Sequence, residues 1–462
     1  MSNYTAAYQA IDQEAEHLIA LAGKIWETPE VAYNEVNACA WIAEALKGYG
    51  FEVEVGASNL PTAIRATWGK GHPVIGILGE YDALPGMSQK VEAVKDPVTV
   101  GGPGHGCGHN LLGVTALGAA LGMKAELEAK GLEGTVVYYG CPGEEQLTGK
   151  SFMAREGAFR DLDIAFSWHG STMNMLTDGT MTGLNSAIFH FKGRTAHAGG
   201  DPHNGRSALD AAELMSVGAN YLREHVTSDV RIHYVYKEAG TAPNIVPDKA
   251  SVWYYVRGMS RQAIEDTYDR LVKVAEGAAH MTETELEIEF LGGCYEGMSN
   301  EYMAYMTHDI MEQIEGPKYT EEELAFADAL NKQSPKYEEC KANGMLDNGP
   351  IATGIAPVVR RSGGGSSDVA DVQHIVPCIG VNTATCNAAA PGHSWQITAC
   401  AGMSIGYKGM LYGGEIVAAA ALKMIEEPEH LVKAKEEFDA KMKNNPYKCP
   451  IGPEIPVPQP QK

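Results

Sequence analysis

The stretch PVIGILGEYD at residues 73–82 joins a short apolar run to two acidic residues. Two similar runs follow, GTVVYYG at 134–140 and DIAFSW at 163–168, and a helical pattern spans 111–130 between the first and the second. Short apolar runs that alternate with helices are typical of buried parallel strands. The sequence therefore predicts an α/β fold with a mixed, mainly parallel sheet flanked by helices.

Polar side chains follow each of these predicted strands at the point where the strand ends. Asp82 follows the first strand, Glu144 and Glu145 follow the second, and His169 follows the third. In open α/β sheets, ligands bind in the crevice at the carboxyl ends of the strands. We therefore expect these four side chains to converge on one site.

The segment HGCGH at residues 105–109 places three possible metal ligands at alternate positions, separated by glycines that permit a tight turn. If the segment is extended, Cys107 and His109 face the same side and could bind one ion together. The alternative is a buried thiol beside a hydrogen-bonded core histidine. His105 could simply line the loop, and we do not assign it as a ligand.

Glu144 and Glu145 are either a solvated acidic pair in a loop or two working carboxylates. The Cys-Pro-Gly turn before them and their place at a strand end favour the second reading. At a metal site, one carboxylate can bind the ion while its neighbour takes a proton from the bound water. The sequence does not decide which glutamate has which task.

Two further histidines, His169 and His393, could complete such a site. Each has an ordinary alternative, since His169 follows an aromatic residue and His393 lies in the turn PGHSW. Together with Cys107, His109 and one glutamate they supply five ligands, which suits two ions that share one ligand. A nucleotide site is disfavoured because the glycines at 363–365 lack the Lys-Ser/Thr of a phosphate loop.

A second structural unit is predicted over residues 183–294. Helical and strand patterns follow one another there, with strands at 187–192, 232–236 and 250–256 and helices at 205–224 and 261–281. This pattern predicts a small α+β domain inserted into a main domain that residues 1–182 and 295–462 form together.

The bulk composition limits the partners and the compartment. The net charge of −23 disfavours nucleic acid and anionic membranes, because both attract basic surfaces. No apolar run reaches the length of a membrane helix, and residues 1–13 do not read as a signal peptide. Nine scattered cysteines fit a reducing compartment, so we expect a cytoplasmic protein.

Several motifs resemble those of a known family, the aminoacylase and carboxypeptidase superfamily of dinuclear metallopeptidases, in its amidohydrolase branch. The matching segments are GEYDALP (79–85), GHGCGHN (104–110), CPGEE (141–145), SWH (167–169), PGHSW (391–395), FKGRTAHAGGDPHNGRSALDAAE (191–213) and APNIVPDKA (242–250). The resemblance covers nearly the whole chain. It implies a catalytic domain with two metal ions and an inserted lid domain, residues 183–294, that forms a dimer.

The resemblance also implies roles for individual residues. Glu144 is expected to be the general base, and Asp82 to orient the metal-site imidazole or ion. In the lid, His197 is expected to reach the partner subunit's active site as an oxyanion stabiliser, while Asn244 and Arg257 hold the substrate carboxylate. The expected metal ligands, with Cys107 bridging, are Cys107, His109, Glu145, His169 and His393.

These expectations combine into one functional hypothesis. Two divalent ions, Mn²⁺ or Zn²⁺, would support hydrolysis of the amide between an acyl or aroyl group and an amino acid, with p-aminobenzoyl-glutamate as the first candidate. The chain is expected to form a homodimer through the lid, or a heteromer with a homologous A-type subunit. A metal-dependent dipeptidase and a chain that is active only with a homologous partner are the alternatives.

Overall fold

The structure is a computed structural model that describes residues 4–461. Within these residues, the larger sheet has nine strands in the order β1-β2-β4-β3-β5-β13-β6-β11, with β12 beside β6. Its strands are β1 (Glu52–Val55), β2 (Ile64–Lys70), β3 (Val74–Glu80), β4 (Gly134–Cys141), β5 (Ile164–Ser171), β6 (Met173–Thr180), β11 (Ala352–Ile355), β12 (Val359–Ser362) and β13 (Cys378–Ala384). The apolar runs PVIGILG, GTVVYYG and DIAFSW contribute β3, β4 and β5.

The centre of this sheet is parallel. β3 pairs in parallel with both β4 and β5, and β5 pairs in parallel with β13. Antiparallel pairs lie toward the sides, between β1 and β2, β2 and β4, and β13 and β6. The prediction of a mixed, mainly parallel sheet is thus confirmed. Every residue of β4 is buried, which explains why the central strands read as continuous apolar runs.

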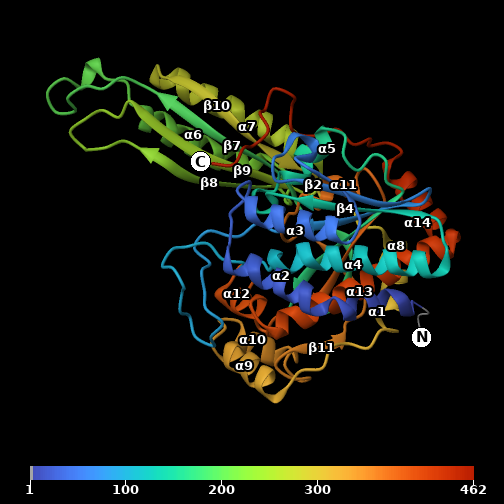
Figure 1. Ribbon diagram of the computed structural model, residues 1–462. Helices are drawn as coiled ribbons and strands as arrows, with labels where there is room; N and C mark the ends of the chain where they lie inside the picture. Colours follow the sequence, from blue (N-terminus) through green and yellow to red (C-terminus); the bar gives the residue numbers. More distant parts are fainter. Residues whose placement is uncertain (1–3, 462) are drawn as a thin grey trace.

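Helices cover both faces of the sheet (Figure 1). They are α1 (Thr5–Gln13), α2 (Ala15–Glu27), α3 (Val36–Gly48), α4 (His109–Lys130), α5 (Gly149–Arg155), α8 (Glu301–Met311), α9 (Glu321–Lys332), α10 (Tyr337–Ala342), α11 (Val369–Gln373), α12 (Trp395–Ala401), α13 (Ser404–Glu426) and α14 (Pro428–Met442). α4 and α13 lie side by side against the sheet, whereas α5 and α11 pack together on the opposite face. Among residues 4–461, each helix is too short or too polar to span a lipid bilayer.

Glycine permits the close contact between α4 and the sheet. A Cβ at Gly79 in β3 would lie 2.6 Å from the hydroxyl of Tyr138 and 3.2 Å from the Cβ of Ala116 in α4. In the C-terminal part of the chain, α12 and α13 follow each other with a short break between them. At the break, Gly402 packs against Trp26, where a Cβ would lie 2.4 Å from the ring.

A separate four-stranded antiparallel sheet, in the order β10-β7-β9-β8, forms the projecting lobe at the upper left of Figure 1. Its elements are β7 (Gly183–Lys192), α6 (Ala208–Leu222), β8 (Arg231–Ala239), β9 (Lys249–Gly258), α7 (Arg261–Thr282) and β10 (Glu285–Cys294). α6 and α7 cover one face and share an apolar core with the sheet. All six elements lie within the range predicted for the inserted domain, although β10 was not predicted.

Candidate metal centre

The HGCGH segment forms a tight turn that leads into α4. Gly108 caps the helix with a left-handed backbone (φ 80°), and His109 is the first helical residue. The segment is therefore turned rather than extended. Cys107 and His109 nevertheless lie on the same site, because the turn brings both ligand atoms to the carboxyl end of β5.

The five predicted ligands form two groups of three, and Cys107 belongs to both groups. In each group the ligand atoms lie within 4.8 Å of one another; the groups are Cys107, His109 and His169, and Cys107, Glu145 and His393. The Cys107 Sγ lies 3.2 Å from His169 Nε2, and His393 Nε2 lies 3.7 Å from Glu145 Oε2. Two ions that share one thiolate would use this arrangement.

Asp82 contacts two of these residues at once, the side chain of His109 and the backbone of Glu145. Its Oδ1 lies 2.9 Å from His109 Nδ1, and its Oδ2 accepts a hydrogen bond of 2.9 Å from the backbone N–H of Glu145. His169 is oriented in the same way, because its Nδ1 lies 2.6 Å from the carbonyl oxygen of Gly170. Partners on Nδ1 leave the Nε2 atoms of both imidazoles free to face the site, as in most histidine ligands of metals.

Two buried atoms facing the site have no hydrogen-bond partner within residues 4–461. They are Nε2 of His109 and Oε1 of Glu145. Leaving a buried polar atom unpaired is costly, and a bound water or an ion is among the ways in which such an atom is satisfied. Imidazole nitrogen, thiolate sulfur and carboxylate oxygen together form a donor set that divalent transition metals prefer. The residues present therefore fit divalent metal ions.

The charge states agree with this donor set. Burial opposes ionisation of Cys107, but His169 and His109 hold the pKa of its thiol well below the ordinary value. Burial lowers the pKa of His169, yet the neighbouring thiolate raises it to about 9. A thiolate among histidines is what a soft divalent metal binds.

Glu144 lies beside the ligands in a short helical turn, Glu144–Gln146, directly after β4. Its carboxylate Oε2 is 3.9 Å from His109 Nε2. Burial, together with the nearby carboxylates of Glu80 and Asp368, raises the pKa of Glu144 well above its ordinary value. A buried carboxyl group with a raised pKa beside a group of candidate metal ligands suits proton transfer.

A buried network that was not predicted from the sequence lies behind Glu144. Lys150, the second residue of α5, is fully buried, and its Nζ lies 2.5 Å from Glu80 Oε1 and 2.7 Å from Asp368 Oδ1. Glu80 Oε2 lies 3.5 Å from His109 Nε2. These residues are separated by 70 and 218 positions in the chain, so local patterning could not bring them together. Only the acidic end of the GEYD motif pointed to Glu80.

The three predicted lid residues lie apart from this cluster. Within residues 4–461, no hydrogen bond or ion pair joins His197, Asn244 or Arg257 to the ligands. His197 is exposed, and its Nδ1 accepts the N–H groups of two following glycines. Arg257 donates to Ser366 Oγ at 2.7 Å, at the base of the lid. Their predicted roles stay predictions.

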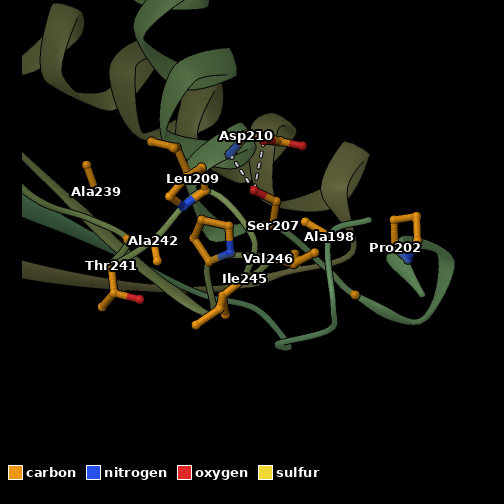
Figure 2. A pocket seen from close by; sticks show the side chains of 14 residues that line it. Ala198, Pro202, Ser207, Leu209, Asp210, Ala239, Thr241, Ala242, Ile245 and Val246 are labelled. Carbon is orange, nitrogen blue, oxygen red and sulfur yellow. Dashed lines mark hydrogen bonds between the residues drawn. The ribbon is translucent and has the colours of Figure 1, made fainter. Parts of the chain in front are cut away.

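His197 and Asn244 flank a pocket in the lid itself. It measures about 600 Å³ and is lined by two loops, at residues 198–210 and 239–247. Figure 2 shows Ser207 and Asp210 hydrogen-bonded to each other at its wall, with Leu209 and Ile245 beside them. None of the five candidate metal ligands lines this pocket, so the metal centre and the lid pocket are separate places on one chain.

Comparison with known proteins agrees with these features. Residues 180–283 match the peptidase dimerisation domain. The chain is 37% identical to the B-type subunit of p-aminobenzoyl-glutamate hydrolase from Escherichia coli, over 98% of each chain. It is 29% identical to the Xaa-Arg dipeptidase of Mus musculus, over 94% of this chain and 92% of that one.

Solved structures share the fold. An aminobenzoyl-glutamate utilization protein from Klebsiella pneumoniae superposes with a TM-score of 0.62 at 18% identity, over 91% of this chain and 98% of that one. A dinuclear metal-binding peptidase of the M20 family from Bacillus subtilis gives a TM-score of 0.57 at 17% identity, over 90% and 99%. At these identities the likeness establishes the architecture.

Proposed function

Because the chain belongs to the M20 family of metallopeptidases, we propose that it hydrolyses the amide bond between an acyl or aroyl group and an amino acid. The observation that carries the proposal is the pair of three-residue ligand groups that share Cys107, with Glu144 beside them. The 37% identity to one chain of a p-aminobenzoyl-glutamate hydrolase makes p-aminobenzoyl-glutamate the first substrate to test.

In this proposal the five ligands, Cys107, His109, Glu145, His169 and His393, hold two divalent ions per subunit, Mn²⁺ or Zn²⁺. When bound, such ions acidify a water molecule and polarise the amide carbonyl. Glu144 accepts the proton of that water on its carboxylate and later delivers it to the leaving nitrogen. Asp82 holds the His109 ring in the tautomer that leaves Nε2 free for an ion.

The lid residues complete the proposed site from a second chain. The partner subunit's His197 would donate to the developing oxyanion, where loss of one donor typically costs about 3 kcal/mol. Arg257 would pair with the carboxylate of the amino acid, and Asn244 would assist it. A guanidinium at this place offsets the repulsion that the net charge of −23 exerts on an anionic substrate.

The proposed assembly follows from the lid. Residues 183–294 would form a lid and dimerisation domain on a catalytic domain made of 1–182 and 295–462. The dimer would contain two copies of this chain, or one copy with a homologous A-type subunit, since the two E. coli relatives are named as different subunits of one hydrolase. We place this assembly in the cytoplasm, with a small molecule as its substrate.

A panel of amides tests the proposed function. The purified chain, alone and with added Mn²⁺ or Zn²⁺, is assayed with p-aminobenzoyl-glutamate, other N-acyl amino acids and dipeptides that end in arginine. We expect cleavage of the aroyl and acyl amino acids. Cleavage of the dipeptides alone would favour the dipeptidase, to which the 29% identity with the mouse enzyme points. Activity that appears only after addition of an A-type subunit would show that the homologous partner is required.

A further inference from the structure

Lys150 is buried without access to solvent, next to the candidate metal centre. A buried ammonium group is stable only when it is paired, and Lys150 has two carboxylate partners, Glu80 and Asp368. One cation between two carboxylates leaves one negative charge uncompensated. The network is therefore anionic, and it lies directly behind the ligands.

The backbone fixes Lys150 in this place. Gly149, at the start of α5, packs so closely against the CPGEE turn that a Cβ there would lie 1.7 Å from the carbonyl oxygen of Pro142. Asp368 also accepts the backbone N–H of Lys150 at 2.8 Å. The backbone of Lys150 is therefore anchored beside the strand end that carries Glu80.

The two carboxylate oxygens of Glu80 have different neighbours. Its Oε1 accepts from Lys150, whereas its Oε2 points toward the unpaired Nε2 of His109, 3.5 Å away. Glu80, His109 and Glu144 have ligand atoms within 4.8 Å of one another. If Lys150 no longer held Oε1, either carboxylate oxygen of Glu80 could turn toward His109 Nε2.

We propose that Lys150 is a positioning residue that tethers Glu80 and keeps it out of the ligand set of the metal centre. This inference rests on the proposed metal centre and adds a determinant of its affinity and reactivity. An additional carboxylate strengthens binding of a divalent ion by charge, but it makes the ion a weaker Lewis acid. Holding Glu80 away from the ions thus lowers the affinity for metal and raises the Lewis acidity of the bound ions.

The test measures binding of Mn²⁺ and Zn²⁺ to metal-depleted protein by competition with a chelating dye. The variant Lys150→Met/Asp368→Asn removes one positive and one negative charge, so the charge of the network is the same as in the wild type while Glu80 is released. We expect this variant to bind the ions about tenfold more tightly, or more, and to turn over more slowly at saturating metal. The KM for substrate should change little.

Three further variants separate positioning from charge and from folding. Adding Glu80→Gln to the double variant should abolish the gain in affinity, and Glu80→Gln alone should weaken binding only modestly, through the loss of one negative charge near the ions. Lys130→Met serves as the matched control. Lys130 also pairs with two carboxylates, Glu126 and Glu426. It lies at the other end of α4, about 31 Å from His109. It should leave metal binding unchanged.

The ligand set can also be observed directly. With Co²⁺ in the site, a carboxylate oxygen added to the metal's ligands changes the visible absorption bands, because their intensity depends on coordination geometry. We expect such a change in the double variant and its loss when Glu80→Gln is added. Destabilisation of the fold alone would not produce this pattern.

The outcomes distinguish this inference from the proposed function. Unchanged or weaker binding in the double variant would overturn the tether. A loss of affinity in Glu80→Gln alone as large as that in Glu145→Gln would overturn it too, since Glu80 would then already be a ligand. If the wild-type protein itself bound no divalent ion, the proposed metal centre would fail and the tether with it.

Discussion

Asp82 offers the sharpest test of how the ligands are held. Its two oxygens bind His109 Nδ1 and the backbone N–H of Glu145, both at 2.9 Å. In Asp82→Asn one oxygen is replaced by an NH₂ group, so one of these two contacts is lost. If the NH₂ group faces His109, the imidazole must carry its proton on Nε2, the atom that should bind the ion. The lost contact is charge-assisted and contributes about 1.5–3 kcal/mol.

We therefore expect Asp82→Asn to weaken metal binding by about 10–100-fold, which matches the usual effect of removing a partner of a histidine ligand. The affinity is measured by titrating metal-depleted protein against a chelator of known strength. Asp163→Asn is the control. Asp163 also contacts a histidine, His72, and a backbone N–H, but it lies just before the first residue of β5, toward the opposite end of that strand from His169. Equal affinity in Asp82→Asn and the wild type would refute the orienting role.

Three further predictions concern the base, the partner subunit and stability. Glu144→Gln should lower turnover by about 10²–10⁴-fold with both ions still bound, as metal analysis and steady-state assays would show; a near wild-type rate would refute the assignment. Mixing inactive Glu144→Gln and His197→Ala chains should restore about a quarter of the wild-type activity, since half of the exchanged dimers are mixed and each has one intact site; no recovery after proven exchange would contradict the contribution in trans. Burial, with Asp12 nearby, raises the pKa of Glu415 to about 7, so this side chain destabilises the fold increasingly as pH rises from about 4.5 to 7. Glu415→Gln should accordingly raise Tm at pH 8 but not at pH 4, and an equal shift at both pH values would argue against this cause.

Much of the catalytic domain could be predicted because its determinants are local. The central strands are buried on both faces, so β3, β4 and β5 appear as continuous apolar runs. Glu145 follows β4 and His169 lies near the end of β5, and parallel strands bring such positions to one edge of the sheet. Cys107 and His109 lie where the chain enters α4. This is why Cys107, His109 and one of the two glutamates could be grouped from the sequence alone.

Other features depend on contacts between distant parts of the chain. The strand β10 is an exception, because its segment ELEIEF (285–290) carries the polar–apolar alternation of a half-exposed strand, a local signal that the prediction missed. Lys150 reads as an ordinary surface lysine in a helix, and only the fold reveals that Glu80 and Asp368 surround it. The proposed contact of residues 183–294 with a partner subunit's site would be a property of the assembly, which local patterns in one chain do not encode.

Hydrolysis of an amide by this chain should depend on divalent ions bound around Cys107. The most direct measurement is the rate of p-aminobenzoyl-glutamate cleavage by the chelator-treated protein before and after addition of Mn²⁺ or Zn²⁺, with metal content determined in parallel. We predict negligible turnover without metal and full recovery as two ions per subunit are bound. Turnover that is independent of metal content, or Cys107→Ala protein that binds two ions and cleaves the substrate like the wild type, would contradict it.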